Sequence, residues 1–312
     1  MPLTGNRVDP RVGANSSATN LRWPPEVFLI GAQKAGTTSL AAWMAAHRDI
    51  AVSTPKETDF FTGRWAQGWE WYANCFKNAR GTVLVDASTS YSMAPLPGTL
   101  PPRALEASLL KDVPKRIFAA RPDARFIYVL RDPIDRAYSA YWHGRRGGYE
   151  SRPLREAATA SSLYIRGSSY SYQIRHYLEF FPIERFLFLD FRQLRTDPEA
   201  VLRQCWDFIG VEPIEPSAAD ARNEGFQFNR AGQLITSLIG GNRPDSFLNR
   251  QVTRRLPRPV RGVLRRILTT SIPPITDEER AFLNRHVADE YAKTLVLSGI
   301  DFQSALPWTG RW

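Results

Sequence analysis

Residues 27–40 read VFLIGAQKAGTTSL, an apolar strand that leads into a glycine-containing loop and then a helix. The backbone amides of such a loop and the N terminus of the next helix bind phosphate groups. Gly31 and Gly36 have the spacing of the triphosphate-binding loop GxxxxGK[ST], and Thr38 occupies its last position. The lysine before that position is replaced by threonine, and a lysine lies inside the loop instead, at Lys34. The sequence therefore predicts a phosphorylated ligand that is not bound in the way that a triphosphate-binding loop binds Mg-ATP.

Apolar runs alternate with helical patterns over the first two thirds of the chain. Several of these runs are short and continuous, as expected for parallel strands that are buried on both faces. The alternation predicts an α/β fold with a doubly wound parallel sheet, in which ligands bind beyond the C-terminal strand ends. The predicted strands are Val27–Ile30, Ile50–Val52, Thr82–Val85, Arg125–Leu130 and Arg185–Leu189, and the predicted helices are Thr38–His47, Ile134–Arg145, Ser169–Phe180, Pro198–Ile209 and 276–298.

The length of 312 residues suits one α/β domain with elaborations. We expect a flexible polar tail over residues 1–22 and a single domain over residues 23–312. Within that domain, the part from about residue 211 to residue 312 is irregular, rich in proline and basic. Its last helix has a capping box, because Thr276 is followed three residues later by Glu279.

The charge of the chain indicates an anionic partner. Lys and Arg number 41 against 31 Asp and Glu, which gives a formal net charge of +10. Genomic composition explains such an excess equally well. The cysteines, Cys75 and Cys205, are not in a CxxC pattern, which favours a reducing cytoplasm and a cytoplasmic location. The sequence shows no apolar secretory signal and no apolar run long enough for a membrane span.

Three further segments carry polar side chains at or after predicted strands. Residues 55–61 read PKETDFF, residues 84–91 read LVDASTSY, and residues 128–141 read YVLRDPIDRAYSAY. Together with the glycine loop, in this order and spacing, they resemble the sulfotransferase family that uses 3′-phosphoadenosine 5′-phosphosulfate (PAPS). The likeness covers roughly residues 25–210 and concerns above all the Golgi heparan-sulfate-type branch and its bacterial relatives. The resemblance therefore implies a P-loop-like sulfotransferase fold and, for this chain, a bacterial and cytoplasmic enzyme.

The resemblance assigns the glycine loop to the 5′-phosphosulfate group of the donor. In the family, backbone amides and hydroxyls of this loop hold the donor, and its lysine, here Lys34, steadies the bridging oxygen. Sulfuryl transfer leaves negative charge on the departing phosphate, so a cation there stabilises the transition state without a metal ion. The product is 3′-phosphoadenosine 5′-phosphate (PAP). The implied donor-binding residues of the loop are Gly31, Lys34, Ala35, Gly36, Thr37, Thr38 and Ser39.

Arg131 and Ser139 match the pair of residues that binds the 3′-phosphate in the family. An arginine at a strand end and a serine two helical turns later suit one phosphate, and a guanidinium forms bidentate bonds with it. This contact distinguishes PAPS from ATP, which has no 3′-phosphate. The alternative is that Arg131 pairs with Asp132 or Asp135.

Glu57 matches the general base of the heparan-sulfate-type branch. A carboxylate at this position removes the proton from an acceptor hydroxyl or amine as it attacks sulfur. The alternative is a solvated loop carboxylate. Asp59 is a weaker candidate for the same role, and His143 is interpreted as an ordinary helix residue.

The chain departs from the family pattern in two places. Ala87 stands where heparan-sulfate-type enzymes commonly have a lysine, which puts a glycosaminoglycan acceptor in doubt. No cysteine follows Cys205, so the disulfide-bridged loop that covers the nucleotide in those enzymes cannot form. The residues considered for covering the nucleotide instead are Phe226, Arg222, Arg243 and the arginines of 250–266.

Two other function classes stay open on the sequence alone. A P-loop kinase or NTPase fits the glycine spacing and the strand that ends at Asp86. A basic, non-enzymatic membrane- or nucleic-acid-binding protein fits the charge and the run Arg250–Arg266, which also suggests peripheral membrane contact of an enzyme. We expect the enzyme, with no nucleic-acid partner, and an acceptor that is a saccharide, a glycolipid or a small metabolite. Trp65, Trp69, Trp71 and Tyr72 form either a sugar-stacking wall or, more simply, a packed helix.

Overall fold

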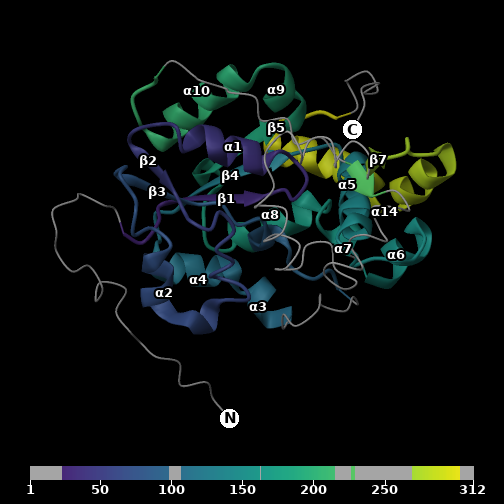
Figure 1. The fold of residues 1–312 in the computed structure, drawn as a ribbon, viewed down its shortest axis with the longest axis horizontal. Helices are drawn as coiled ribbons and strands as arrows, with labels where there is room; N and C mark the ends of the chain where they lie inside the picture. Colours follow the sequence, from purple (N-terminus) through teal and green to yellow (C-terminus); the bar gives the residue numbers. More distant parts are fainter. Residues whose placement is uncertain (1–22, 98–106, 162, 215–225, 229–268, 303–312) are drawn as a thin grey trace, which may run out of the picture.

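A five-stranded parallel sheet forms the centre of the molecule (Figure 1). The computed structural model describes residues 23–97, 107–161, 163–214, 226–228 and 269–302. The strand order is β2-β3-β1-β4-β5, and each neighbouring pair is parallel. The predicted doubly wound sheet is therefore confirmed, and each strand lies within one residue of its predicted bounds. The strands are β1 (Val27–Gly31), β2 (Ile50–Val52), β3 (Val83–Asp86), β4 (Arg125–Leu130) and β5 (Phe186–Asp190).

Helices cover both faces of this sheet. Figure 1 shows α1, α9 and α10 on one face and α2, α4 and α8 on the other, while α5, α6, α7 and α14 gather beyond one end. An antiparallel pair, β6 (Phe226–Phe228) and β7 (Thr269–Ser271), forms a second small sheet. The helices are α1 (Thr37–Met44), α2 (Gly68–Asn74), α3 (Ala107–Lys111), α4 (Val113–Ala120), α5 (Pro133–Arg146), α6 (Leu154–Ser161), α7 (Leu163–Arg166), α8 (Tyr170–Leu178), α9 (Phe191–Thr196), α10 (Pro198–Ile209) and α14 (Asp277–Ser298), with 3₁₀ turns η1 (Trp65–Gln67), η2 (Thr89–Ser92) and η3 (Ile183–Arg185).

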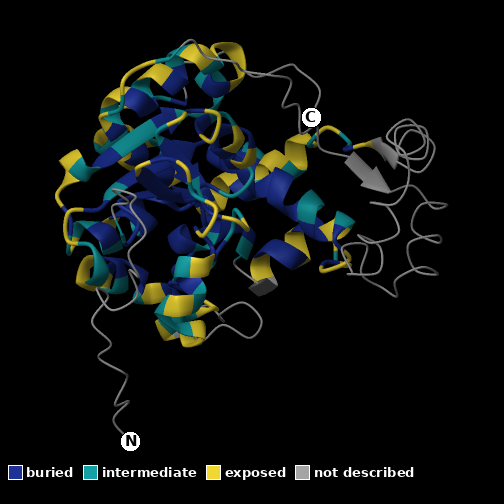
Figure 2. Ribbon diagram, turned by 60° about the vertical axis from the view of Figure 1, so that its left-hand side comes forward, coloured by how far each residue is buried: buried dark blue, intermediate teal, exposed yellow. Residues whose placement is uncertain are grey.

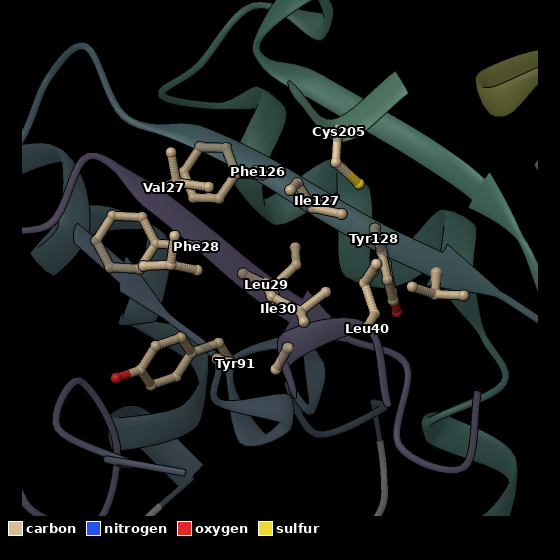
Figure 3. Close-up of a cluster of buried hydrophobic side chains, with 14 of the residues drawn as sticks. Val27, Phe28, Leu29, Ile30, Leu40, Tyr91, Phe126, Ile127, Tyr128 and Cys205 are labelled. Atoms are coloured by element: carbon tan, nitrogen blue, oxygen red, sulfur yellow. The ribbon is translucent and has the colours of Figure 1, made fainter. Parts of the chain in front are cut away.

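The central strands are buried because both of their faces carry apolar side chains. All five residues of β1 are buried, and the sheet forms the dark centre of Figure 2. On one face, the ring of Phe28 stacks on that of Phe126 at 5.9 Å, and Phe126 meets Tyr177 of α8 at 4.9 Å. Figure 3 shows the two phenyl rings together within the cluster that also holds Leu40. This rigid core fixes the strand ends at which the predicted site residues lie.

The predicted capping box is confirmed, and α10 also begins with a side-chain cap. The side chain of Asp197 accepts from the amide of Ala200 at the start of α10, with a proline in the first turn. Thr276 and Glu279 form both bonds of the capping box at the start of α14. This helix reaches the site, because the hydroxyl of Tyr291 donates to Asp132 at 2.9 Å at the N terminus of α5.

Several predictions concern residues outside the described ranges. They are the tail 1–22, Arg222, Arg243 and the basic run Arg250–Arg266. The backbone of Phe226 is described as part of β6. No helix in the described part of the chain has the length and hydrophobicity of a membrane span.

Candidate functional site

The predicted site residues lie at the C-terminal edge of the parallel sheet. The glycine loop follows β1, the segment of Glu57 follows β2, and Arg131 directly follows β4. Because the carboxyl ends of parallel strands meet at one edge, the fold brings these three segments together.

The loop after β1 is fixed by backbone hydrogen bonds. The amide of Ala32 donates to the carbonyl of Val129 at 2.8 Å, and the amide of Ala35 donates to the carbonyl of Ala32 at 3.0 Å. Helix α1 then begins at Thr37, one residue before its predicted start. No side chain caps this helix N terminus, since the N-cap residue is Gly36. The uncapped N terminus, with its partial positive charge, suits an anion.

Gly36 requires the left-handed backbone conformation, with φ at +81°. An added Cβ would lie 2.9 Å from Leu194 Cδ2 of α9. Gly36→Ala is therefore expected to lower the free energy of unfolding by about 1–2 kcal/mol and to weaken PAP binding. Gly299→Ala is the matched control, because Gly299 has φ +72° and open space around it. Urea denaturation should show a loss in both variants, whereas calorimetry should show weaker PAP binding only in Gly36→Ala.

Lys34 lies among positive charges. Its own φ is +73°, and its side chain is partly buried. Burial, followed by the charges of Arg146, Arg131 and Arg136, lowers the pKa of Lys34 to about 8. The three arginine charges therefore repel that of Lys34, and a polyanionic ligand at the loop would relieve that repulsion.

Arg131 ties the loop to the end of β4. Its side chain is 8% exposed, and its Nη1 donates to the carbonyl oxygen of Lys34 at 2.8 Å. The guanidinium lies over the ring of Phe191, 4.8 Å from the centroid. Burial lowers the pKa of Arg131 to about 10, so it stays cationic at neutral pH.

Asp132 and Asp135, the two aspartates considered as partners of Arg131, lie close enough that their charges act against the lowering of its pKa, and each also has contacts of its own. Asp132 caps α5 by accepting from the amide of Asp135 at 2.9 Å. The carboxylate of Asp135 lies 3.2 Å from Arg280 of α14. Ser139 lies two turns into α5 with its side chain buried, on the helix that these contacts anchor.

Glu57 is held between two loops. The backbone amide of Thr89 donates to its Oε2 at 2.7 Å, and Lys56 Nζ donates to its Oε1 at 2.5 Å. Lys56 Nζ also lies 3.4 Å from Thr37 Oγ1 in the glycine loop. Glu57 is therefore oriented next to the glycine loop, with part of its side chain open to solvent.

The two weaker base candidates are in different surroundings. Asp59 accepts from Ser90 Oγ at 2.6 Å, which points its carboxylate into the η2 turn. His143 lies in α5, as interpreted from the sequence, and its Nδ1 is 2.9 Å from Arg146. Burial and the charges of Lys34 and Arg146 lower the pKa of His143 to about 4, so its imidazole is neutral at pH 7.

The tryptophan-rich segment after Glu57 packs against the core, as the simpler interpretation held. The ring of Phe60 lies 4.1 Å from that of Tyr72 in a stacked arrangement and 5.1 Å from that of Trp69. Trp65 packs against Phe60 at 5.2 Å. The motif KETDFF thus contributes its polar residues to the site and its phenylalanines to the core.

A buried network of hydroxyl groups surrounds Asp86, which the sequence did not predict. This residue ends β3, and four hydroxyl groups donate to its carboxylate. The strand-end aspartate was visible in the sequence, but its partners come from three separate parts of the chain.

Comparison with known proteins agrees with this geometry. Residues 24–238 match the family model described as "Sulfotransferase domain". The heparan sulfate glucosamine 3-O-sulfotransferase 6 of Homo sapiens is 26% identical over 255 residues, which cover 78% of this chain and 67% of that protein. The bifunctional heparan sulfate N-deacetylase/N-sulfotransferase 4 of Mus musculus is 29% identical over 213 residues. That match covers 61% of this chain and 22% of the mouse protein, so the chain spans about a fifth of it.

A solved structure shares the fold. The sulfotransferase from Alicyclobacillus acidocaldarius is 25% identical and superposes with a TM-score of 0.53, covering 76% of this chain and 98% of that chain. The family match covers more than half of the chain and includes the glycine loop, Glu57 and Arg131. The chain therefore belongs to the sulfotransferase domain family, in which PAPS is the typical sulfuryl donor.

Proposed function

We propose that this protein transfers a sulfuryl group from PAPS to a hydroxyl or amine of an acceptor. The observation that carries the proposal is the loop before the uncapped N terminus of α1, in which Lys34 lies within the influence of three arginine charges and Arg131 is bonded to its carbonyl oxygen. This charge suits a ligand with a phosphosulfate at one end and a second phosphate at the other. Family membership supports the same donor.

The donor lies with its 5′-phosphosulfate across residues 31–39 and its 3′-phosphate on Arg131 and Ser139. The glycine loop and the residue proposed for the 3′-phosphate are in direct contact, because Arg131 donates to the carbonyl of Lys34. Binding of the two ends of the donor is thereby coupled through one hydrogen bond. The loop needs no Mg²⁺ in this arrangement, since Lys34 supplies the positive charge.

Transfer requires a base on the acceptor side and a cation on the leaving side. Glu57 takes the proton of the acceptor hydroxyl or amine as its oxygen or nitrogen forms a bond to sulfur. The bond between sulfur and the bridging oxygen breaks, and Lys34 stabilises the negative charge left on the 5′-phosphate of PAP. The products are the sulfated acceptor, PAP and the proton on Glu57, so atoms and charge balance.

Acceptor chemistry is tested with a panel that represents the three classes open from the sequence. We would incubate the enzyme with PAPS and a desulfated glycosaminoglycan oligosaccharide, a galactosyl glycolipid in micelles, or 2-naphthol, with water alone as the baseline. The expected result is PAP release above the baseline with at least one acceptor and without Mg²⁺. A strict Mg²⁺ requirement with ATP as the consumed nucleotide would instead support the kinase alternative.

Arg131→Ala is expected to raise the dissociation constant for PAP about 100-fold, or about 2.7 kcal/mol. The lost contacts are those of a buried guanidinium with the 3′-phosphate, so the loss should be much smaller for AMP, which lacks that group. Isothermal titration calorimetry measures both ligands. Arg175→Ala is the control, because Arg175 is an exposed arginine of α8. Equal weakening of PAP and AMP binding would contradict the 3′-phosphate assignment.

A further inference from the structure

Asp86 is a fully buried carboxylate that accepts four hydroxyl hydrogen bonds. Ser88 Oγ donates to its Oδ1 at 2.6 Å. Thr58 Oγ1, Tyr72 hydroxyl and Tyr91 hydroxyl each donate to its Oδ2 at 2.7 Å. The donors come from the loop after β2, from α2, and from the segment after β3, so one carboxylate joins three parts of the chain.

Three of these hydroxyl oxygens also accept backbone amides from residues 59–61. This stretch directly follows Glu57 and Thr58. Each hydroxyl has a single hydrogen, so a hydroxyl that accepts an amide and donates to Asp86 is oriented by both contacts. The three contacts are Asp59 N to Ser88 Oγ at 3.1 Å, Phe60 N to Thr58 Oγ1 at 3.2 Å and Phe61 N to Tyr91 hydroxyl at 3.3 Å.

An ionised Asp86 accepts all four of these hydrogen bonds at once. A carboxylate has only acceptor sites and takes all four hydroxyl hydrogens, whereas a protonated Asp86 would place its own hydrogen among four donors. One hydroxyl would then accept from Asp86 and direct its own hydrogen elsewhere, as Thr58 could toward Ser88 Oγ at 3.2 Å or Tyr91 hydroxyl at 3.0 Å. The bonds to the ionised carboxylate therefore orient the hydroxyls that accept the amides of residues 59–61.

The same network holds Glu57 from two sides. Thr58, which donates to Asp86, is the next residue after Glu57. Ser88, which also donates to Asp86, precedes Thr89, and the amide of Thr89 donates to Glu57 Oε2 at 2.7 Å. A shift of either loop relative to Asp86 would move the Glu57 carboxylate away from its donor amide.

Stability alone does not explain a charge at this position. The ionisable groups around Asp86 are Tyr72 and Cys75 of α2, Tyr91 of η2 and Tyr177 of α8. Among the residues that the structure describes, none of the ion pairs of lysine or arginine involves Asp86. Burial raises the pKa of Asp86 to about 6, against the opposing effect of its hydroxyl donors. An unpaired buried charge costs folding free energy, which points to a role in the site.

We propose that Asp86 is a positioning residue that, through Thr58, Ser88 and Tyr91, holds Glu57 in the orientation needed to accept the acceptor's proton. The inference rests on the proposed role of Glu57 as the base. Asp86 itself touches neither donor nor acceptor and acts through the residues that orient Glu57.

The first experiment is a double-mutant cycle on turnover, measured as PAP release with the most active acceptor of the panel. Asp86→Asn is expected to lower kcat about 100-fold, the typical effect of misplacing a catalytic group by about 1 Å. The dissociation constant for PAP should stay within about twofold, which also shows that the variant is folded. In the Glu57→Gln background, Asp86→Asn should add less than about threefold, because it acts through Glu57.

Two phenol variants provide a test that does not depend on the folding of Asp86→Asn. The hydroxyls of Tyr72 and Tyr91 both donate to Asp86 Oδ2 at 2.7 Å, but only that of Tyr91 also binds the amide of Phe61. Tyr91→Phe should therefore reduce kcat at least tenfold more than Tyr72→Phe. Equal effects of the two variants would overturn the inference, since a purely structural network would treat both phenols alike.

The pH profile of kcat gives a third readout. The wild-type enzyme should lose activity as the pH falls through about 6, where Asp86 becomes protonated, and Asp86→Asn should lack that limb. Full activity of Asp86→Asn together with an inactive Glu57→Gln would overturn the positioning role but leave the base intact. Full activity of Glu57→Gln would overturn the base itself, and the inference with it.

Discussion

Glu57→Gln is expected to reduce kcat about 1,000-fold while the dissociation constant for PAP stays unchanged. General base catalysis contributes about 10²–10⁴-fold, and glutamine has no basic oxygen to accept the proton. The Glu57 carboxylate is oriented by the Thr89 amide and by Lys56, and both contacts have oxygen as acceptor. The amide oxygen of glutamine can keep one of them, so the loop should keep its conformation.

The matched control is Glu70→Gln, which neutralises an exposed glutamate in the first turn of α2. Its turnover should equal that of the wild type. Asp59→Asn tests the weaker candidate and should lose at most about tenfold, because that carboxylate is engaged with Ser90. If Asp59→Asn were inactive and Glu57→Gln active, the base would be Asp59.

Lys34→Ala should lower kcat about 100- to 1,000-fold, the range measured when one group that stabilises a developing oxyanion is removed. The effect on PAP binding should be smaller, because the charge on the bridging oxygen appears only as its bond to sulfur breaks. Single-turnover measurements with PAPS separate the chemical step from binding. Lys77→Ala is the control, since Lys77 is exposed near the end of α2.

The pH dependence of Lys34 gives an independent readout. Its pKa is lowered to about 8, so the free enzyme carries the lysine charge below pH 8 and loses it above. The value of kcat/KM for PAPS should therefore fall about tenfold per pH unit above about pH 8. Lys34→Arg should shift this limb to higher pH, because arginine stays protonated. An unchanged limb in Lys34→Arg would assign it to another group.

The parallel sheet and the donor loop could be predicted because local sequence determines them. Continuous apolar runs gave five strands within one residue of their bounds, and the strand-end positions of the glycine loop and Arg131 placed them at one edge. The helices α3, α4, α6, α7 and α9 were missed, since each is at most eight residues long and too brief to show a clear helical period. The basic run Arg250–Arg266 lies outside the described residues, so membrane contact stays a prediction.

The contacts that orient Glu57 could not be predicted from the sequence. The amide of Thr89 is 32 residues from Glu57 along the chain, and because every residue except proline has a backbone amide, the sequence does not indicate which one binds Glu57. The partners of Asp86 could not be predicted for a similar reason, because serine, threonine and tyrosine residues are common in any sequence and nothing marks these four as neighbours of one carboxylate. Only the packing of α2 and η2 on the sheet brings their hydroxyls to one carboxylate.

Isothermal titration calorimetry of the wild-type protein with PAP, AMP and Mg-ATP tests the central claim most directly. The account predicts tight binding of PAP without metal ion, and binding of AMP and of Mg-ATP at least about 100-fold weaker, because only PAP carries the 3′-phosphate that Arg131 and Ser139 would bind. Tighter binding of Mg-ATP than of PAP would contradict it. The roles given to Lys34, Glu57 and Arg131 would then have to be withdrawn.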